Sequence, residues 1–217
     1  MANKIIENRR CVIIAGAPGA DAEFVAQTVR RDDFVICADS GYDTAERAGV
    51  KPDLIVGDFD SFDRDALPAD CEIIELKPDK NDTDTFHCVE VAFERGFTHF
   101  VLLASTGGRL DHTLANLSVL DYIDRRGGEG IILSKNESIR VLAVGYHDFR
   151  DCSGQTFSVM PFGCDAVTLS YIGAKYPLNR ETLFHSVARG VSNVFIGDKS
   201  EIKVHSGKAV LIIENSV

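Results

Sequence analysis

The stretch FVLLASTGGRLDHTLANLSVL, residues 100–120, decides the fold class. Its first part, Phe100–Ala104, is a continuous apolar run, which is typical of a strand covered on both faces of a sheet. A short polar loop with two glycines, Ser105–Gly108, follows the run. Leucines then recur at steps of three and four residues from Leu110 to Leu120, through Leu114 and Leu117, which predicts a long helix with one apolar face. A fully apolar strand that leads through a short loop into a helix is the repeating unit of parallel α/β sheets.

The same alternation of strand and helix extends toward the N-terminus. The predicted strands of this half are Cys11–Ala17, Phe34–Ala38, Leu54–Val56, Glu72–Leu76 and Ile131–Leu133, and the other predicted helices are Asp21–Arg30 and one that begins near Asp82 or Thr83. Apolar strands alternating with helices predict a mostly parallel sheet with helices on both faces.

After about Ser134 the pattern changes to short β-rich segments separated by Gly, Asn, Asp and Pro, with no helical stripe. Such a pattern is typical of a small antiparallel β-sandwich, with a barrel as the alternative. Ser206-Gly207 and Gly197-Asp198 are predicted to be hairpin turns. We therefore expect an α/β domain over residues 1–134 and a β-sandwich domain over residues 135–217.

The composition limits the possible partners and locations. The chain of 217 residues has a formal net charge of −10 and a pI near 5.0, which argues against nucleic-acid and membrane-surface partners, because both require a basic face. Met1–Arg10 lacks the apolar core of a signal peptide, and the apolar runs are too short to cross a bilayer. Six scattered cysteines without a CxxC pair predict reduced thiols, and so a cytoplasmic protein.

Acidic residues follow several predicted strands. Asp39, Asp58, Asp60 and Asp84 are expected to converge, because the carboxyl ends of parallel strands share one edge of the sheet. In the run Gly57–Ser61, the two aspartates at positions i and i+2 can reach one cation. Carboxylates of this kind suit Mg²⁺, which would also offset their repulsion of an anionic ligand. The alternative is that each aspartate only caps a helix or makes a turn.

The loop before the long helix combines glycines with a guanidinium group. Gly107 and Gly108 let backbone N–H groups approach a phosphate at a helix N-terminus, and Arg109 can bind phosphate oxygens through two hydrogen bonds. Lys80, beside the acidic cluster, is either a phosphate contact or a counter-charge. Asp111 and His112 can also be ordinary first-turn residues. The chain has neither a Walker-A motif nor a GxGxxG motif.

Together these segments resemble the thiamine pyrophosphokinase family. The resemblance rests on motifs that follow one another in the family's order: Asp39-Ser40-Gly41, Pro52-Asp53, Gly57–Ser61, Lys80–Asp84, Gly107–His112 with Asn116, Gly173–Leu178 and Gly190–Asn193. It implies an α/β domain that binds ATP and Mg²⁺, a C-terminal β-sandwich, and a homodimer in which thiamine lies between the α/β domain of one subunit and the sandwich of the other.

The resemblance also implies the reaction and the residues that take part. A diphosphate passes from ATP to the thiamine hydroxyl, which gives AMP and thiamine diphosphate. The implied roles are metal binding and catalysis for Asp58, Asp60 and Asp84 with Lys80, ATP binding for Asp39, Gly107, Gly108, Arg109, Asp111 and Asn116, and thiamine binding for Ser192, Asn193 and Tyr176. Asp111 and Asn116 would either contact the nucleotide or order the glycine loop. Tyr176 is either an aromatic partner of thiamine or a buried residue of the sandwich.

Some positions depart from the family pattern. Asn81 stands where bacterial members often have Asp, and Ala174 where Leu is more common, and the chain has no Trp. Two other functions remain open, because the N-terminal metal chemistry and the fold could also serve them. One is a diphosphokinase for another heterocyclic alcohol such as a hydroxymethylpterin, and the other is a nucleotide or thiamine sensor without catalysis.

Overall fold

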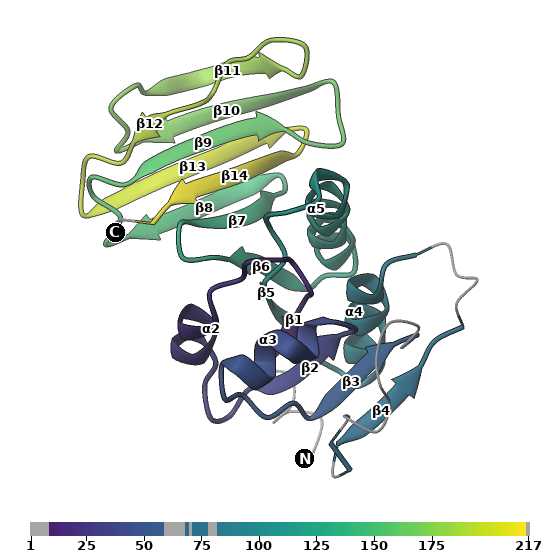
Figure 1. The fold of residues 1–217 in the computed structure, drawn as a ribbon. Coiled ribbons are helices and arrows are strands. Elements are labelled where there is room, and N and C mark those ends of the chain that lie inside the picture. The colour runs from purple at the N-terminus through teal and green to yellow at the C-terminus, as the bar shows by residue number, and fades with distance from the viewer. Residues whose placement is uncertain (1–8, 59–67, 70, 78–81, 216–217) are drawn as a thin grey trace. The chain divides into compact units, whose positions relative to one another are not determined.

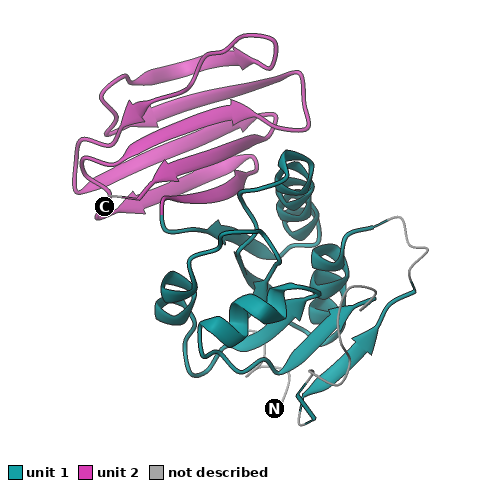
Figure 2. Cartoon of the chain, in the orientation of Figure 1, with its two compact units in different colours: residues 1–135 teal, residues 136–217 magenta. Residues whose placement is uncertain are grey.

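The computed structural model describes residues 9–58, 68–69, 71–77 and 82–215. Asp60 and Lys80, which the sequence assigns to the site, lie outside the described residues. The chain divides into two compact units, residues 1–135 and residues 136–217 (Figure 2).

Unit 1 alternates strands and helices along the chain (Figure 1). Its elements are β1 (Arg10–Ile14), α2 (Ala22–Thr28), β2 (Phe34–Ala38), α3 (Gly41–Arg47), β3 (Leu54–Gly57), β4 (Glu72–Glu75), α4 (Asp84–Glu94), β5 (His99–Leu103), α5 (Leu110–Arg125) and β6 (Glu129–Leu133). Every strand pair in this unit is parallel, in the order β6-β5-β1-β2-β3-β4 for the described residues. The predicted parallel α/β fold is therefore confirmed.

Helices cover both faces of this sheet because its strands are apolar on both faces. Val12 and Ile14 pack with α2 and α3 on one face, through Val25 and Ala45. On the other face α4 and α5 pack against the strands, and the Phe93 ring lies 4.7 Å from the Phe100 ring. The helix over Leu110–Arg125 is confirmed, but its buried residues are Asn116, Val119, Leu120 and Ile123, whereas Leu110 and Leu114 are exposed.

Unit 2 contains antiparallel strands (Figure 1). They are β7 (Glu137–Leu142), β8 (Gly145–Arg150), β9 (Thr156–Pro161), β10 (Ala166–Ile172), β11 (Leu178–Phe184), β12 (Asn193–Val194), β13 (Lys199–Ser206) and β14 (Ala209–Glu214). One layer has the order β12-β9-β14-β7 and the other β11-β10-β13-β8. Alternate residues from both layers form a single core, in which the Phe157 and Phe195 rings stack 4.1 Å apart. The predicted antiparallel β-region is confirmed.

Both predicted hairpins in this unit are wrong. Ser206-Gly207 connects β13 to β14, but β13 pairs with β10 and β8, whereas β14 pairs with β7 and β9. Gly197-Asp198 connects β12, which pairs with β9, to β13 in the other layer. Both turns therefore carry the chain from one layer to the other. Strands that follow each other in the sequence here pack face to face across the sandwich, and each pairs with other strands within its own layer.

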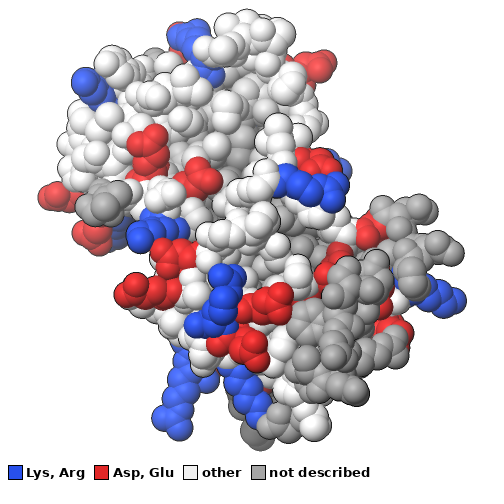
Figure 3. All heavy atoms as spheres, viewed as in Figure 1, with Lys and Arg blue, Asp and Glu red and all other residues white. Residues whose placement is uncertain are grey.

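The surface charges agree with the acidic composition. On the face drawn in Figure 3, the described Lys and Arg side chains are interspersed with Asp and Glu rather than gathered into one basic area. Among the described residues, the helices are all too short or too polar to cross a membrane.

Candidate active site

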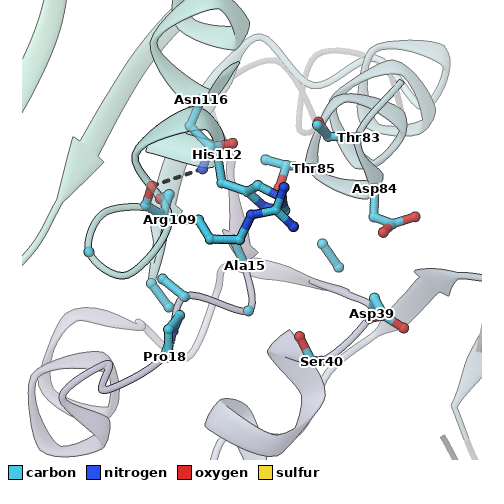
Figure 4. A pocket seen from close by; sticks show the side chains of 16 residues that line it. Ala15, Pro18, Asp39, Ser40, Thr83, Asp84, Thr85, Arg109, His112 and Asn116 are labelled. Carbon is cyan, nitrogen blue, oxygen red and sulfur yellow. Dashed lines mark hydrogen bonds between the residues drawn. The ribbon is translucent and has the colours of Figure 1, made fainter. Parts of the chain in front are cut away.

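A cavity of about 240 Å³ opens in unit 1 at the carboxyl ends of β1, β2 and β5 and at the amino ends of α4 and α5 (Figure 4). The chain runs from β1 through β2, β3 and β4 on one side, then returns to the other side of β1 with β5 and β6. The strand order therefore reverses between β1 and β5, and open α/β sheets bind their ligands at such a reversal.

Glycines bring the strand ends together around this cavity. A Cβ atom on Gly16, after β1, would collide with the Ser40 hydroxyl, so a larger residue there would require the Ser40 side chain to move. A Cβ atom on Gly57, at the end of β3, would lie 3.1 Å from the Asp39 Cα. Gly57, the residue directly before Asp58, therefore lies beside Asp39.

Two residues that line the cavity have left-handed backbone conformations without being glycine. Asp39 follows β2 with φ of 45°, and Ala104 follows β5 with φ of 51°. Such conformations are unfavourable for residues with a Cβ atom and tend to occur at functional sites. At both strand ends, this backbone conformation directs the chain along the wall of the cavity.

Two carboxylates occupy one side of the cavity. Asp39 and Asp84 both line it, and Figure 4 shows them on the same side. Asp84 is the first residue of α4, whose N-cap is Thr83, with a hydroxyl that accepts a hydrogen bond from the Phe86 N–H at 3.3 Å. Within the described residues, no three His, Cys, Asp or Glu side chains are close enough to form a metal site by themselves. One or two carboxylates together with substrate phosphates are nevertheless the usual ligands of Mg²⁺, so this donor set fits the ion.

The glycine loop lies on another wall. Gly107 and Gly108 have φ of +94° and +68°, and a Cβ atom on Gly108 would lie 2.5 Å from the Pro18 Cγ. The loop therefore packs tightly on the segment after β1, and only glycine allows both its conformation and this contact.

Arg109 reaches the cavity from the N-cap of α5 (Figure 4). Its Nη2 and Nε donate hydrogen bonds to the Asp111 carboxylate at 2.6 and 3.1 Å, and both side chains are exposed. This pairing raises the pKa of Arg109 and lowers the pKa of Asp111. Asp111 itself does not line the cavity, but it is hydrogen-bonded to Arg109, which does.

Asn116 is buried and lines the inner end of the cavity. Its Nδ2 donates a hydrogen bond to the Ser105 carbonyl oxygen at 2.8 Å, shown dashed in Figure 4. The sequence left two roles open for Asn116, contact with the nucleotide or ordering of the glycine loop. This hydrogen bond corresponds to the second, because it holds the segment directly before Gly107.

The predicted thiamine residues lie together in unit 2. The Asn193 Oδ1 accepts a hydrogen bond from the Tyr176 N–H at 3.0 Å, and its Nδ2 donates one to the Tyr176 carbonyl oxygen at 2.8 Å. Ser192, with φ of 56°, donates its N–H to the Ser158 hydroxyl. Tyr176 is 59% exposed, so it is not a buried residue of the sandwich.

Comparisons with known proteins match both units. Residues 25–129 match the family model for the thiamin pyrophosphokinase catalytic domain, and residues 146–211 match the model for the thiamin pyrophosphokinase vitamin B1 binding domain. The chain belongs to the thiamine pyrophosphokinase family. The thiamine pyrophosphokinase of Bacillus subtilis is 26% identical over 208 residues, which cover 92% of this chain and 96% of that protein.

Solved thiamine pyrophosphokinase structures share the fold. The Bacillus subtilis structure aligns with a TM-score of 0.85 at 24% identity, covering 96% of this chain and all of that one. The Geobacillus thermodenitrificans structure aligns with a TM-score of 0.82 at 23% identity, covering 95% of this chain and 98% of that one.

The cavity is lined by some of the residues that the sequence predicts for the site and by others that it does not. The cavity brings together Asp39, Asp84, Gly107, Arg109 and Asn116, all of which were predicted. Several other lining residues had not been given a role, among them Gly16, Ser40, Thr85 and Ser105. Ser105 directly follows a predicted strand and Gly16 lies near the end of another, so their place at a strand end was the available signal.

Proposed function

We propose that the cavity of unit 1 holds ATP and that unit 2 supplies thiamine contacts. As a member of its family, the chain is a thiamine diphosphokinase that uses ATP. The observation that carries the assignment of the site is the joint presence of Asp39, Asp84 and Arg109 around one cavity in the part of the chain that matches the catalytic model.

The chemistry follows from the charges of these groups. The thiamine hydroxyl attacks the β-phosphorus and AMP leaves, so the protein has to position the phosphates and offset their charge rather than form a covalent intermediate. Arg109 and the Gly107-Gly108 loop bind phosphate oxygens on one wall. A carboxylate accepts the proton of the thiamine hydroxyl, and Asp58 and Asp60 are the candidates for that base.

Product analysis tests this assignment. Protein, Mg-ATP and thiamine should give AMP and thiamine diphosphate in equal amounts. ADP with thiamine monophosphate would show an ordinary kinase step instead, and turnover only with a hydroxymethylpterin would show another acceptor.

Mg²⁺ is the cation that we propose for the acidic side. Asp84 would hold it, with Asp58 and Asp60 as further ligands and Asp39 beside them. When bound, the ion would neutralise charge on the transferred phosphates. Chelation with EDTA should abolish turnover and weaken ATP binding, whereas full activity in EDTA would contradict the assignment.

We also propose that the active site is shared across a homodimer, as the family resemblance implies. Asp58 belongs to unit 1 and Ser192 to unit 2. Mixing Asp58→Asn protein with Ser192→Trp protein, each inactive alone, would create mixed dimers with one intact site. After complete subunit exchange, verified with tagged chains, activity should return to about a quarter of wild type. No recovery would show that each site lies within one chain.

The cytoplasm is the location that we propose. All six cysteines lie among the described residues, and none forms a disulfide. Burial raises the pKa of the Cys11 and Cys37 thiols, which keeps them protonated. Buried, protonated thiols of this kind are compatible with a reducing compartment.

A further inference from the structure

The hydroxyl of Ser105 has an unusual environment in the cavity wall. Ser105 follows Ala104 at the end of β5, lines the cavity and is only 3% exposed. Its Oγ is buried and has no hydrogen-bond partner among the described residues. A buried hydroxyl without a partner destabilises the folded protein, so such groups in native proteins call for an explanation.

The backbone that carries this hydroxyl is held on both sides. The Ser105 carbonyl oxygen accepts the hydrogen bond from Asn116, and the carbonyl oxygen of Ala104 accepts one from the Ala17 N–H at 2.9 Å. Both neighbouring peptide groups are therefore held in place. The Oγ takes no part in these contacts, so the fold does not need it.

The surroundings indicate which kind of acceptor the hydroxyl would meet. Gly107 and Arg109 line the same cavity, and the 16-residue helix α5 begins directly after them. A guanidinium group and a helix N-terminus both favour negative charge nearby. In Figure 4, Asn116, whose amide holds Ser105, lies across the cavity from Asp39 and Asp84. The Ser105 wall is thus on the cationic side, where an anionic oxygen is the favoured acceptor.

We infer that the Ser105 Oγ donates a hydrogen bond to a phosphate oxygen of ATP and is a nucleotide-binding residue of this enzyme. This inference rests on the proposed function, because it requires that the cavity holds ATP. It adds a contact to the glycine loop and Arg109, and it explains why a polar side chain is kept at a buried position.

The test compares Ser105→Ala with Ser118→Ala by calorimetric binding to the intact protein. Ser118 is an exposed serine on α5, and its hydroxyl already bonds the Leu114 carbonyl oxygen at 3.3 Å. The three probes are ATP, inorganic triphosphate and adenosine. We expect Ser105→Ala to weaken the binding of ATP and of triphosphate about tenfold to a hundredfold, which is the range for loss of a hydrogen bond to a charged group. The affinity for adenosine should stay unchanged. Ser118→Ala should change none of them.

A thermal melt separates binding from folding. Ser105→Ala removes a buried polar atom that has no partner, so its melting temperature should equal or exceed that of the wild type. Ser105→Cys, which keeps the volume but is a weaker donor, should fold and show most of the same loss of triphosphate affinity.

The other outcomes overturn the inference. Weaker adenosine binding with unchanged triphosphate would place the hydroxyl on the nucleoside, and unchanged binding of all probes would mean that it meets only water. If Ser105→Ala and Ser105→Cys both had lower melting temperatures and lost affinity equally for all three probes, the hydroxyl would have a structural role. If the wild type binds ATP but makes no thiamine diphosphate, the proposed reaction fails while the Ser105 test still stands. If it binds no ATP, both fail.

Discussion

The two candidate half-sites use polar side chains in opposite ways. In unit 1, Asp84 and Arg109 extend into a cavity, where they can contact a ligand directly. In unit 2, the Asn193 amide bonds both backbone groups of Tyr176, and its Oδ1 also accepts the Val194 N–H. The first half-site therefore presents charge, whereas the second fixes the shape of a segment. The Asn193 side chain thus holds the backbone of Tyr176 and Val194.

The largest effect that distinguishes the two half-sites is expected at Asp84. Asp84→Asn should lower kcat by at least about a hundredfold, because it weakens the proposed binding of the Mg²⁺ that would neutralise the transferred phosphates. Asp43→Asn is the matched control, since Asp43 is also an acidic first-turn residue, in α3, but does not line the cavity. Both changes remove a favourable charge near a helix N-terminus, worth roughly 0.3–1 kcal/mol of stability. Equal kcat values for the two variants would refute a catalytic role for Asp84.

A smaller and differently distributed effect is expected at Asn193. Asn193→Ala should raise the KM for thiamine about tenfold and leave ATP affinity unchanged, because the lost contacts hold Tyr176 rather than a phosphate. The unpaired backbone groups should also lower the free energy of unfolding by about 1–3 kcal/mol. The control is Asn179→Ala, at an exposed position in β11. If Asn193→Ala changed the affinity for ATP as much as the KM for thiamine, the two half-sites would not act on separate substrates.

The left-handed backbone of Ala104 offers a test of strain in the cavity wall. Ala104→Gly should stabilise the protein by up to about 1 kcal/mol, because glycine adopts positive φ without steric cost. Ala92→Gly, inside helix α4, should destabilise it by about 1 kcal/mol. The measurement is chemical denaturation of both variants. Destabilisation by Ala104→Gly would mean that its methyl group contributes more by packing than the backbone strain costs.

The smallest effect concerns the exposed pair between Arg109 and Asp111. Hydrogen bonds from Arg109 lower the pKa of Asp111, so the pair contributes stability above the ordinary Asp pKa and loses it as pH falls through the lowered value. Both groups are exposed, so this contribution is small. In Arg109→Ala, the Asp111 pKa measured by carboxyl NMR titration should rise toward its ordinary value. An unchanged pKa would show that Arg109 does not hold the carboxylate in solution.

The hydrophobic pattern of the sequence predicted helices and strands correctly where it extended over enough residues. The apolar run at Phe100–Ala104 and the leucine spacing after Leu110 identified β5 and α5 correctly. The helix Gly41–Arg47 was not predicted, because seven residues give too little periodicity to recognise. The turn at Ser206-Gly207 was taken for a hairpin, because a turn sequence does not show whether the strands on either side belong to the same layer.

The sequence by itself determined the fold class of each unit, the family motifs, and the presence of Asp39, Asp84 and Arg109 at strand and helix ends. These features depend on neighbours in the chain, which a sequence displays directly. Only the tertiary structure decided that Ser105 buries its hydroxyl in the cavity wall, and that Asn193 binds the backbone of Tyr176, 17 residues away. Both depend on which strand ends and loops pack together, and that is set by sheet order and core packing rather than by local sequence.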